Sequence, residues 1–205
     1  MNTAPIPYAV GQVRHSALDS LDYFPTPPWA TRALLDWLEA NVASHLPACS
    51  CWEPAAGGRH MSAVLAERFR TVAATDVPDY GNLDGIGSFV GVGADVIETP
   101  RHLAWPHGRV DWVITNPPFN LADAFLERAL AVAVAGVALL LRSAWIDGLA
   151  RWETVFSRVP PTSVLQFAER VPMVKGRWAP SASTAPPYAW VVGRGARASA
   201  APRRG

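Results

Sequence analysis

The sequence predicts one doubly wound α/β sheet that is parallel at its start and carries an antiparallel strand late in the chain. Segments with strand character alternate with segments of helical periodicity. The first strand leads into a glycine-containing turn and a helix, which is the usual opening of such a sheet. The run 137–141 is continuously apolar, as expected for a strand buried on both faces. With 205 residues, the chain suffices for one domain and is short for two.

The domain is expected to occupy residues 21–194. Residues 1–20 have no sustained periodicity and are interpreted as a flexible N-terminal arm. Residues 195–205 are rich in alanine, arginine and proline, so we expect a disordered basic tail.

The elements follow from periodicity and from helix-capping signals. The first helix is expected over 27–45, with Thr26 as N-cap and Pro27 at the first helical position. Its apolar positions with helical spacing are Trp29, Ala33, Leu34, Trp37 and Leu38. A later helix over 121–135 should stop at Gly136, and another is expected over 144–156. Strands are expected at 50–54, 71–76, 109–115, 137–141, 163–169 and 188–192. The last two could pair antiparallel.

Composition excludes several classes of protein. No apolar run approaches the roughly 20 uncharged residues that span a bilayer. The N-terminus lacks a basic segment followed by an apolar one, so we expect no secretory signal and a cytoplasmic location. Cys49 and Cys51 are one residue apart, which suits reduced structural thiols better than a disulfide. No cluster of histidine, cysteine and carboxylate has metal-ligand spacing, so we expect no metal.

The stretch Asn116-Pro117-Pro118-Phe119 follows the expected strand 109–115 directly. Each proline lacks an N–H and has φ fixed near −65°, and Pro117 disfavours the α region for Asn116. The asparagine is therefore presented from a stiff turn at the carboxyl edge of the sheet, where ligands of open α/β sheets bind.

Two further strand ends carry polar groups. The strand 50–54 leads through Glu53, Pro54 and Ala55 to Gly57, and glycines there let backbone N–H groups approach a ligand. Asp76 lies about twenty residues further on, the offset at which a carboxylate takes the ribose hydroxyls of an adenosine cofactor. Alternatively, Asp76 caps the next turn.

Five motifs follow one another along the chain: Thr26-Pro27-Pro28, Glu53 to Gly57, Asp76, Asp95-Val96-Ile97 and Asn116 to Phe119. In this order, they resemble the motifs of the S-adenosylmethionine-dependent DNA adenine-N6 methyltransferases, of the small type found in phages and prophages. The resemblance covers about residues 22–192 and implies a Rossmann-like sheet of the class I methyltransferase type. There are two departures. Arg59 stands where the family usually has a second glycine, and a glycine-rich stretch precedes Asp95.

The resemblance implies a role for each matching residue. Thr26 would hold the methionine carboxylate of S-adenosyl-L-methionine, and Asp95 the adenine amine of that cofactor. Glu53, Pro54, Ala55 and Gly57 would line the methionine, Asp76 would take the ribose, and Asn116 would lie between cofactor and acceptor. Asn116 Oδ1 and the Pro117 carbonyl would accept the two N–H bonds of the target amine, with Pro118 stiffening the turn and Phe119 stacking on a flipped-out base.

The loop 170–178 is the best candidate for the DNA contact. Arg170, Lys175 and Arg177 can meet phosphates, and Trp178 can stack on a base. Alternatively, this loop is a solvated hairpin with an apolar anchor. The chain has no room for a large recognition domain, so we expect relaxed or short sequence specificity and a monomer or weak homodimer.

Other acceptors remain open for the same turn. Cytosine N4, RNA and a protein glutamine amide all present a planar amine, although the glutamine enzymes usually have tyrosine after the prolines. A catalytically silent nucleic-acid-binding module of the same fold is a further alternative, motivated by Arg59.

Overall fold

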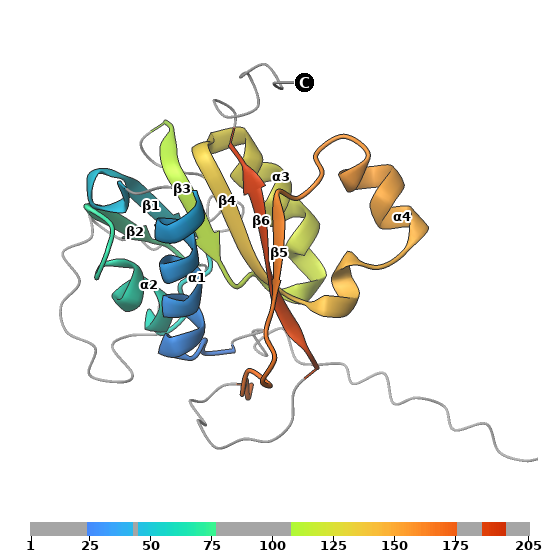
Figure 1. Cartoon of the computed structure of the whole chain (residues 1–205), viewed down its shortest axis with the longest axis horizontal. Coiled ribbons are helices and arrows are strands. Elements are labelled where there is room, and N and C mark those ends of the chain that lie inside the picture. Colours follow the sequence, from blue (N-terminus) through green and yellow to red (C-terminus); the bar gives the residue numbers. More distant parts are fainter. Residues whose placement is uncertain (1–23, 43–44, 77–107, 176–185, 196–205) are drawn as a thin grey trace, which may run out of the picture.

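A six-stranded mixed sheet forms the centre of the computed structural model, which describes residues 24–42, 45–76, 108–175 and 186–195 (Figure 1). The strand order is β2-β1-β3-β4-β6-β5. The strands are β1 (Ser50–Glu53), β2 (Thr71–Ala74), β3 (Val110–Thr115), β4 (Ala133–Arg142), β5 (Ser163–Gln166) and β6 (Tyr188–Arg194).

The pairing confirms the predicted fold class. β2, β1, β3 and β4 are parallel neighbours, whereas β6 pairs antiparallel with both β4 and β5. The parallel strands place their carboxyl ends at one edge of the sheet. At the opposite end, Asp111 Oδ2 accepts hydrogen bonds from the backbone N and the hydroxyl of Ser50, both at 2.8 Å, and so ties β3 to β1.

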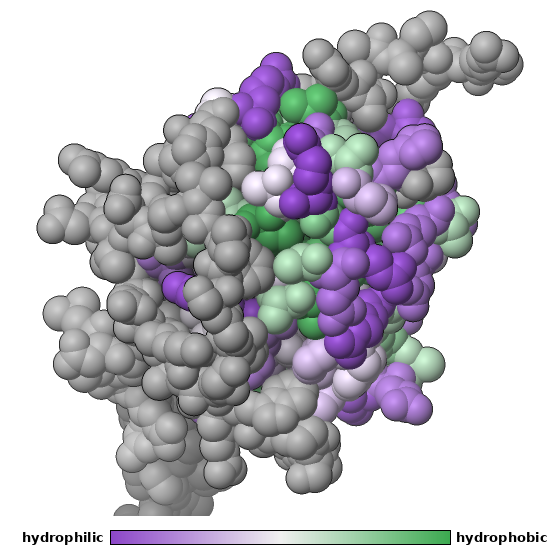
Figure 2. Space-filling view, turned by 90° about the vertical axis from the view of Figure 1, so that its left-hand side faces the viewer, coloured by the Kyte–Doolittle hydropathy of each residue, from purple (hydrophilic) through white to green (hydrophobic). Residues whose placement is uncertain are grey.

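Helices cover both faces of the sheet. Residues of α1 (Pro28–Asn41) and α2 (His60–Leu65) share one core cluster with Cys51 and Trp112. Residues of α3 (Ala122–Val132) share the other with Trp52 and Val113. Neighbouring residues of a strand therefore face opposite cores, as in a doubly wound sheet. Figure 2 shows one outer face, on which hydrophilic residues lie beside a smaller apolar area.

The start of α1 differs from the prediction. The helix has Pro27 rather than Thr26 as N-cap, with no side-chain cap, and it ends at Asn41. Trp29 and Ala33 are exposed, so the expected apolar face was partly wrong. The buried positions are Ala30, Thr31, Leu34, Leu35 and Leu38.

Gly136 does not stop a helix. The helix α3 ends at Val132 and β4 begins at Ala133, so Gly136 lies inside the strand, opposite Trp112 of β3. A Cβ at position 136 would overlap the Trp112 ring. Glycine is therefore needed for the close approach of a large side chain, which helical periodicity does not reveal.

The helix expected over 144–156 is broken into short pieces. A 3₁₀ turn covers Ser143–Ile146, α4 covers Leu149–Arg151 and a π-helical turn covers Trp152–Phe156. Gly148 separates the first two with φ of 106°. In the described part of the chain, no helix is long and apolar enough to cross a membrane, and Cys49 and Cys51 are free thiols.

Candidate active site

The carboxyl edge of the parallel strands brings together the predicted polar residues that the structure describes. Glu53 is the last residue of β1, Asp76 lies two residues beyond β2, and Asn116 directly follows β3. Because these strands are adjacent and parallel (Figure 1), the three residues lie at one edge of the sheet.

The side-chain amide nitrogen of Asn116 is held by three acceptors. Nδ2 donates to the Phe24 carbonyl and to Thr26 Oγ1, both at 3.1 Å, and Met173 Sδ lies 3.7 Å away. A carbonyl and a thioether can only accept, so these contacts assign the nitrogen to this side of the amide. The orientation of the Asn116 side chain is therefore fixed by its neighbours.

The oxygen of the same amide has no hydrogen-bond partner among the described residues. Asn116 Oδ1 is buried, and no described residue donates a hydrogen bond to it. A buried acceptor without a donor costs about 1–3 kcal/mol. The fixed amide thus presents an acceptor to a donor that comes from outside the described protein.

Aromatic rings and one cation surround the turn. The Phe119 ring lies 5.5 Å from the Phe24 ring and 6.0 Å from the Tyr188 ring, between centroids. Arg142 Cζ lies 4.2 Å from the Phe119 centroid, at cation–π distance. Arg142 is the last residue of β4, so its place directly after the apolar run 137–141 is the signal in the sequence for a cation at this edge.

The glycine turn that follows β1 is tied to the end of β2. The Gly57 N–H donates to Asp76 Oδ2 at 2.7 Å, and the Ala56 N–H donates to the Thr75 carbonyl at 3.1 Å. Asp76 therefore braces the turn that follows β1, in addition to any contact with a ligand.

Arg59, which stands where the glycine pattern has its second glycine, has a backbone conformation that glycine favours. Its φ is 66°, and it is the non-glycine residue with positive φ among those described. Glycine adopts this left-handed conformation without cost, whereas other residues pay about 1–2 kcal/mol. The turn thus keeps the backbone shape that a glycine would give, with an arginine in it.

The carboxyl group of Glu53 is deeply buried, with 2% of its surface exposed. It accepts a hydrogen bond from the Ser62 hydroxyl, from the first turns of α2. Burial, together with the charge of Asp76, raises the pKa of Glu53 well above its usual range, which the Ser62 hydrogen bond only partly offsets.

The remaining predicted residues fall into three groups. Pro54 is buried and Ala55 is half-buried beside the glycine turn. Arg170 and Lys175 are exposed, but Val171, Pro172 and Met173 between them are buried. Asp95, Arg177 and Trp178 lie outside the described residues.

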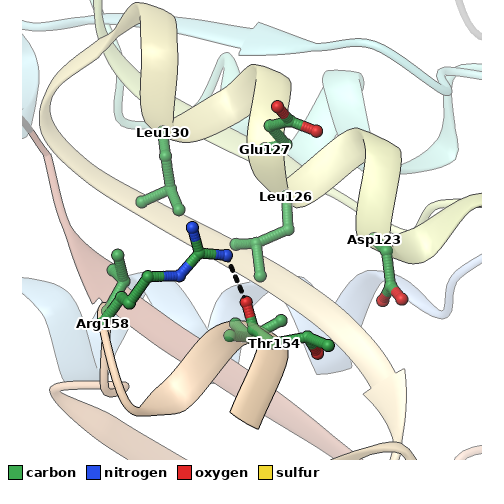
Figure 3. A pocket seen from close by; sticks show the side chains of 8 residues that line it. Asp123, Leu126, Glu127, Leu130, Thr154 and Arg158 are labelled. Carbon is green, nitrogen blue, oxygen red and sulfur yellow. Dashed lines mark hydrogen bonds between the residues drawn. The ribbon is translucent and has the colours of Figure 1, made fainter. Parts of the chain in front are cut away.

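A groove away from this edge contains none of the predicted site residues. It has a volume of about 480 Å³ and lies between α3 and the π-helical turn (Figure 3). Its walls include Leu126 and Leu130 of α3 and, on the opposite side, Arg158, which donates to the Thr154 carbonyl.

No protein-family model and no curated protein sequence matches the chain. Several solved structures, however, are similar to it in fold. One is an assigned RNA methyltransferase of Pyrococcus horikoshii, with a TM-score of 0.63 at 17% identity over 85% of this chain and 87% of that one. The fold is that of the class I methyltransferases.

Two further structures support this fold. An assigned class I S-adenosylmethionine-dependent methyltransferase of Listeria monocytogenes gives a TM-score of 0.58 at 13% identity, over 88% of this chain and 63% of that one. The magnesium protoporphyrin IX methyltransferase of Synechocystis, with S-adenosylmethionine bound, gives 0.56 at 14% identity, over 82% and 79%. At these identities the likeness concerns the class I methyltransferase fold alone.

Proposed function

We propose that the chain transfers a methyl group from S-adenosyl-L-methionine to the N6 amine of adenine in DNA. The observation that carries this proposal is the Asn116 amide, whose nitrogen is held by three acceptors while its buried oxygen has no donor. A carbonyl oxygen held in this way suits an N–H group of the acceptor.

An exocyclic amine is a weak nucleophile because its lone pair is delocalised into the ring. Asn116 Oδ1 and the Pro117 carbonyl would each accept one N–H bond, which draws the nitrogen toward tetrahedral geometry and frees the lone pair. The lone pair forms the new N–C bond in line with the C–S bond that breaks, and the spare proton passes to water. Positive charge grows on the nitrogen during attack, so both acceptors stabilise the transition state more than the ground state.

A neutral amide is better suited to this task than a carboxylate. It supplies the acceptor oxygen without placing a charge in a buried position, which would cost more than burying an amide. The diproline turn and the contacts to Thr26 and Phe24 hold the oxygen in place before the acceptor arrives. Such positioning contributes a large part of the rate enhancement in group transfer.

The cofactor would bind along the ends of β1 and β2 and supply a sulfonium-activated methyl group. Asp76 would accept the ribose hydroxyls, because a carboxylate accepts up to about four hydrogen bonds and the one from Gly57 does not exhaust it. Glu53, Pro54, Ala55 and Gly57 would line the methionine. Asp95 would take the adenine amine, although it lies outside the described residues.

The nucleic acid would reach the site over the loop 170–178. Arg170 and Lys175 are exposed on either side of a buried segment that contacts Asn116, so a strand bound by them would lie close to the acceptor site. Arg177 and Trp178 belong to the same proposed contact. Phe119, at the end of the turn, would pack against a flipped base.

RNA is the second candidate substrate, in keeping with the assignment of the Pyrococcus horikoshii neighbour. The Asn116 geometry is compatible with the adenine amine in either nucleic acid, and also with the N4 amine of cytosine. The test is incubation of DNA and of RNA with methyl-labelled cofactor, followed by nucleoside analysis. We expect N6-methyladenine from DNA. Label in RNA, or on the N4 amine of cytosine, would contradict adenine in DNA as the acceptor and support that alternative substrate.

A protein that fails to bind the cofactor would contradict the proposal altogether. Calorimetry with S-adenosylmethionine measures this directly, because a catalytically silent module would give no binding. We expect binding with one site per chain.

A further inference from the structure

We infer that Thr26 and Met173 are positioning residues, which fix the orientation of the Asn116 amide, and that Thr26 does not act as a ligand of the cofactor. The effect on rate rests on the proposed function, whereas the effect on the amide itself does not. The inference differs from the role that the sequence resemblance implies for Thr26, which is to hold the methionine carboxylate.

The first argument is the number and kind of acceptors around Asn116 Nδ2. An amide nitrogen has two N–H bonds, and here three acceptors surround it: the Phe24 carbonyl, Thr26 Oγ1 and Met173 Sδ. If the amide rotated by half a turn, Oδ1 would face the Phe24 carbonyl and the thioether, both of which carry only lone pairs. The rotated amide would also offer N–H bonds to an acceptor amine that itself needs to donate.

The second argument is the rigidity and burial of Thr26. Its side chain lies between Pro25 and Pro27, both buried, and only 4% of its surface is exposed. The Pro27 carbonyl accepts the Ala30 N–H at 3.0 Å, which joins this segment to the first turn of α1. A stiff segment that is distant in the sequence thus places the Thr26 hydroxyl against Asn116. Because Thr26 is almost fully buried, little of its side chain is accessible to a ligand.

The third argument connects the amide to the proposed nucleic-acid loop. Met173 is 5% exposed and Val171 is fully buried in the core cluster that includes α1. Arg170 and Lys175, on either side, are exposed. A movement of residues 170–175 would therefore move the sulfur that lies against Asn116 Nδ2, so this part of the loop is coupled to the Asn116 amide.

The test compares Thr26→Val, which keeps the shape and removes the hydroxyl, with Thr26→Ser, which keeps the hydroxyl. One hydrogen bond to an amide is worth about 1 kcal/mol, so Thr26→Val should lower kcat by about 5- to 10-fold. The dissociation constant of S-adenosylmethionine, measured by calorimetry on the same proteins, should stay within about twofold, and Thr26→Ser should restore kcat. A weakened cofactor affinity with unchanged kcat would overturn the inference and return Thr26 to the cofactor site.

A second measurement does not depend on catalysis. The side-chain amide protons of Asn116, identified in a nitrogen-15 spectrum by their loss in Asn116→Ala, should exchange slowly with water in the wild type and in Thr26→Ser, and faster in Thr26→Val. Met173→Leu should give a smaller acceleration, because a thioether is a weaker acceptor than a hydroxyl. Equal exchange in wild type and Thr26→Val would overturn the inference. Slow exchange that Thr26→Val accelerates, in a protein that methylates no nucleic acid, would support the inference while the proposed function failed.

Discussion

At the ends of β1 and β2, the buried or half-buried carboxylates already have partners inside the protein. Glu53 accepts from the Ser62 hydroxyl, and Asp76 accepts from the Gly57 N–H. At the end of β3, Asn116 has its nitrogen fully engaged, yet no described residue donates to its buried oxygen. The two neighbouring parts of the same sheet edge thus differ in whether their polar side-chain oxygens have hydrogen-bond donors among the described residues.

Under the proposed function, the ends of β1 and β2 form the cofactor side of the site and the end of β3 forms the acceptor side, so this difference corresponds to two separate roles. On the cofactor side, internal hydrogen bonds shape the turn around Gly57 before any ligand binds. On the acceptor side, the contacts of Asn116 Nδ2 orient the amide, and Asn116 Oδ1 remains available to an incoming donor. Substitutions on the first side should therefore change cofactor affinity and stability, and substitutions on the second should change the rate of transfer.

The largest effect on the cofactor side is expected from Asp76→Ala. Loss of a carboxylate that accepts the ribose hydroxyls and braces Gly57 should weaken S-adenosylmethionine binding by about 10- to 100-fold. At saturating cofactor, kcat should change much less, because the proposal assigns Asp76 to the cofactor and not to the acceptor. Calorimetry measures the cofactor affinity, and steady-state kinetics measures kcat. A collapse of kcat with normal affinity would erase the distinction between the two sides.

Gly136→Ala tests the support of the acceptor strand. The added Cβ would overlap the Trp112 ring of β3, so the free energy of unfolding should fall by about 1–3 kcal/mol. Gly193→Ala in β6 is the matched control, because the position has open space and should cost far less. Urea denaturation measures both. Equal losses for the two variants would mean that Gly136 is not a packing requirement.

Glu53→Gln tests the burial of the carboxyl on the cofactor side. Because the pKa of Glu53 is raised in the folded state, folding favours its protonated form, and stability should fall as pH rises above the ordinary carboxyl pKa toward the folded one. Within this window, one such group contributes up to about 1.4 kcal/mol per pH unit. Glutamine cannot titrate, so the difference between the two stability-against-pH curves isolates this slope. Parallel curves would show that Glu53 is not perturbed.

The smallest effect is expected at the proposed nucleic-acid loop. Replacing both Arg170 and Lys175 by glutamate should weaken binding to DNA and lower the slope of log affinity against log salt by about 1 to 2. Arg70→Glu, at an exposed position beside β2, serves as the control. Filter binding or anisotropy over a salt series measures the slope, and an unchanged slope would move the nucleic-acid contact elsewhere.

Much of the fold was predictable because its signals are local. The diproline turn after an apolar strand placed Asn116 correctly at the sheet edge, and the late antiparallel pair followed from two short strands around one loop. Two of the wrong predictions concern residues whose partners are distant in the sequence. Thr26 does not cap α1, because its hydroxyl meets an amide 90 positions later, and Gly136 belongs to a strand because Trp112 fills the space beside it.

For the candidate site, the sequence shows the motifs but not the contacts between them. The turn itself and the strand-end acids are visible as motifs, and Arg59 becomes intelligible once its positive φ is known. Met173 has no signal in the sequence, because its contact with Asn116 spans 57 positions and depends on how the loop folds back onto α1.

The central claim is that Asn116 acts on the acceptor amine and not on the cofactor. Its most direct test is single-turnover methyl transfer to DNA by wild type and by Asn116→Ala, with cofactor affinity measured on both and Asn120→Ala, an exposed neighbour, as control. We expect transfer by Asn116→Ala to fall at least about 10²-fold, as when one preorganised hydrogen-bonding group is removed, while cofactor affinity stays near that of the wild type. Retained transfer, or a loss of cofactor affinity that accounts for the whole defect, would contradict the claim.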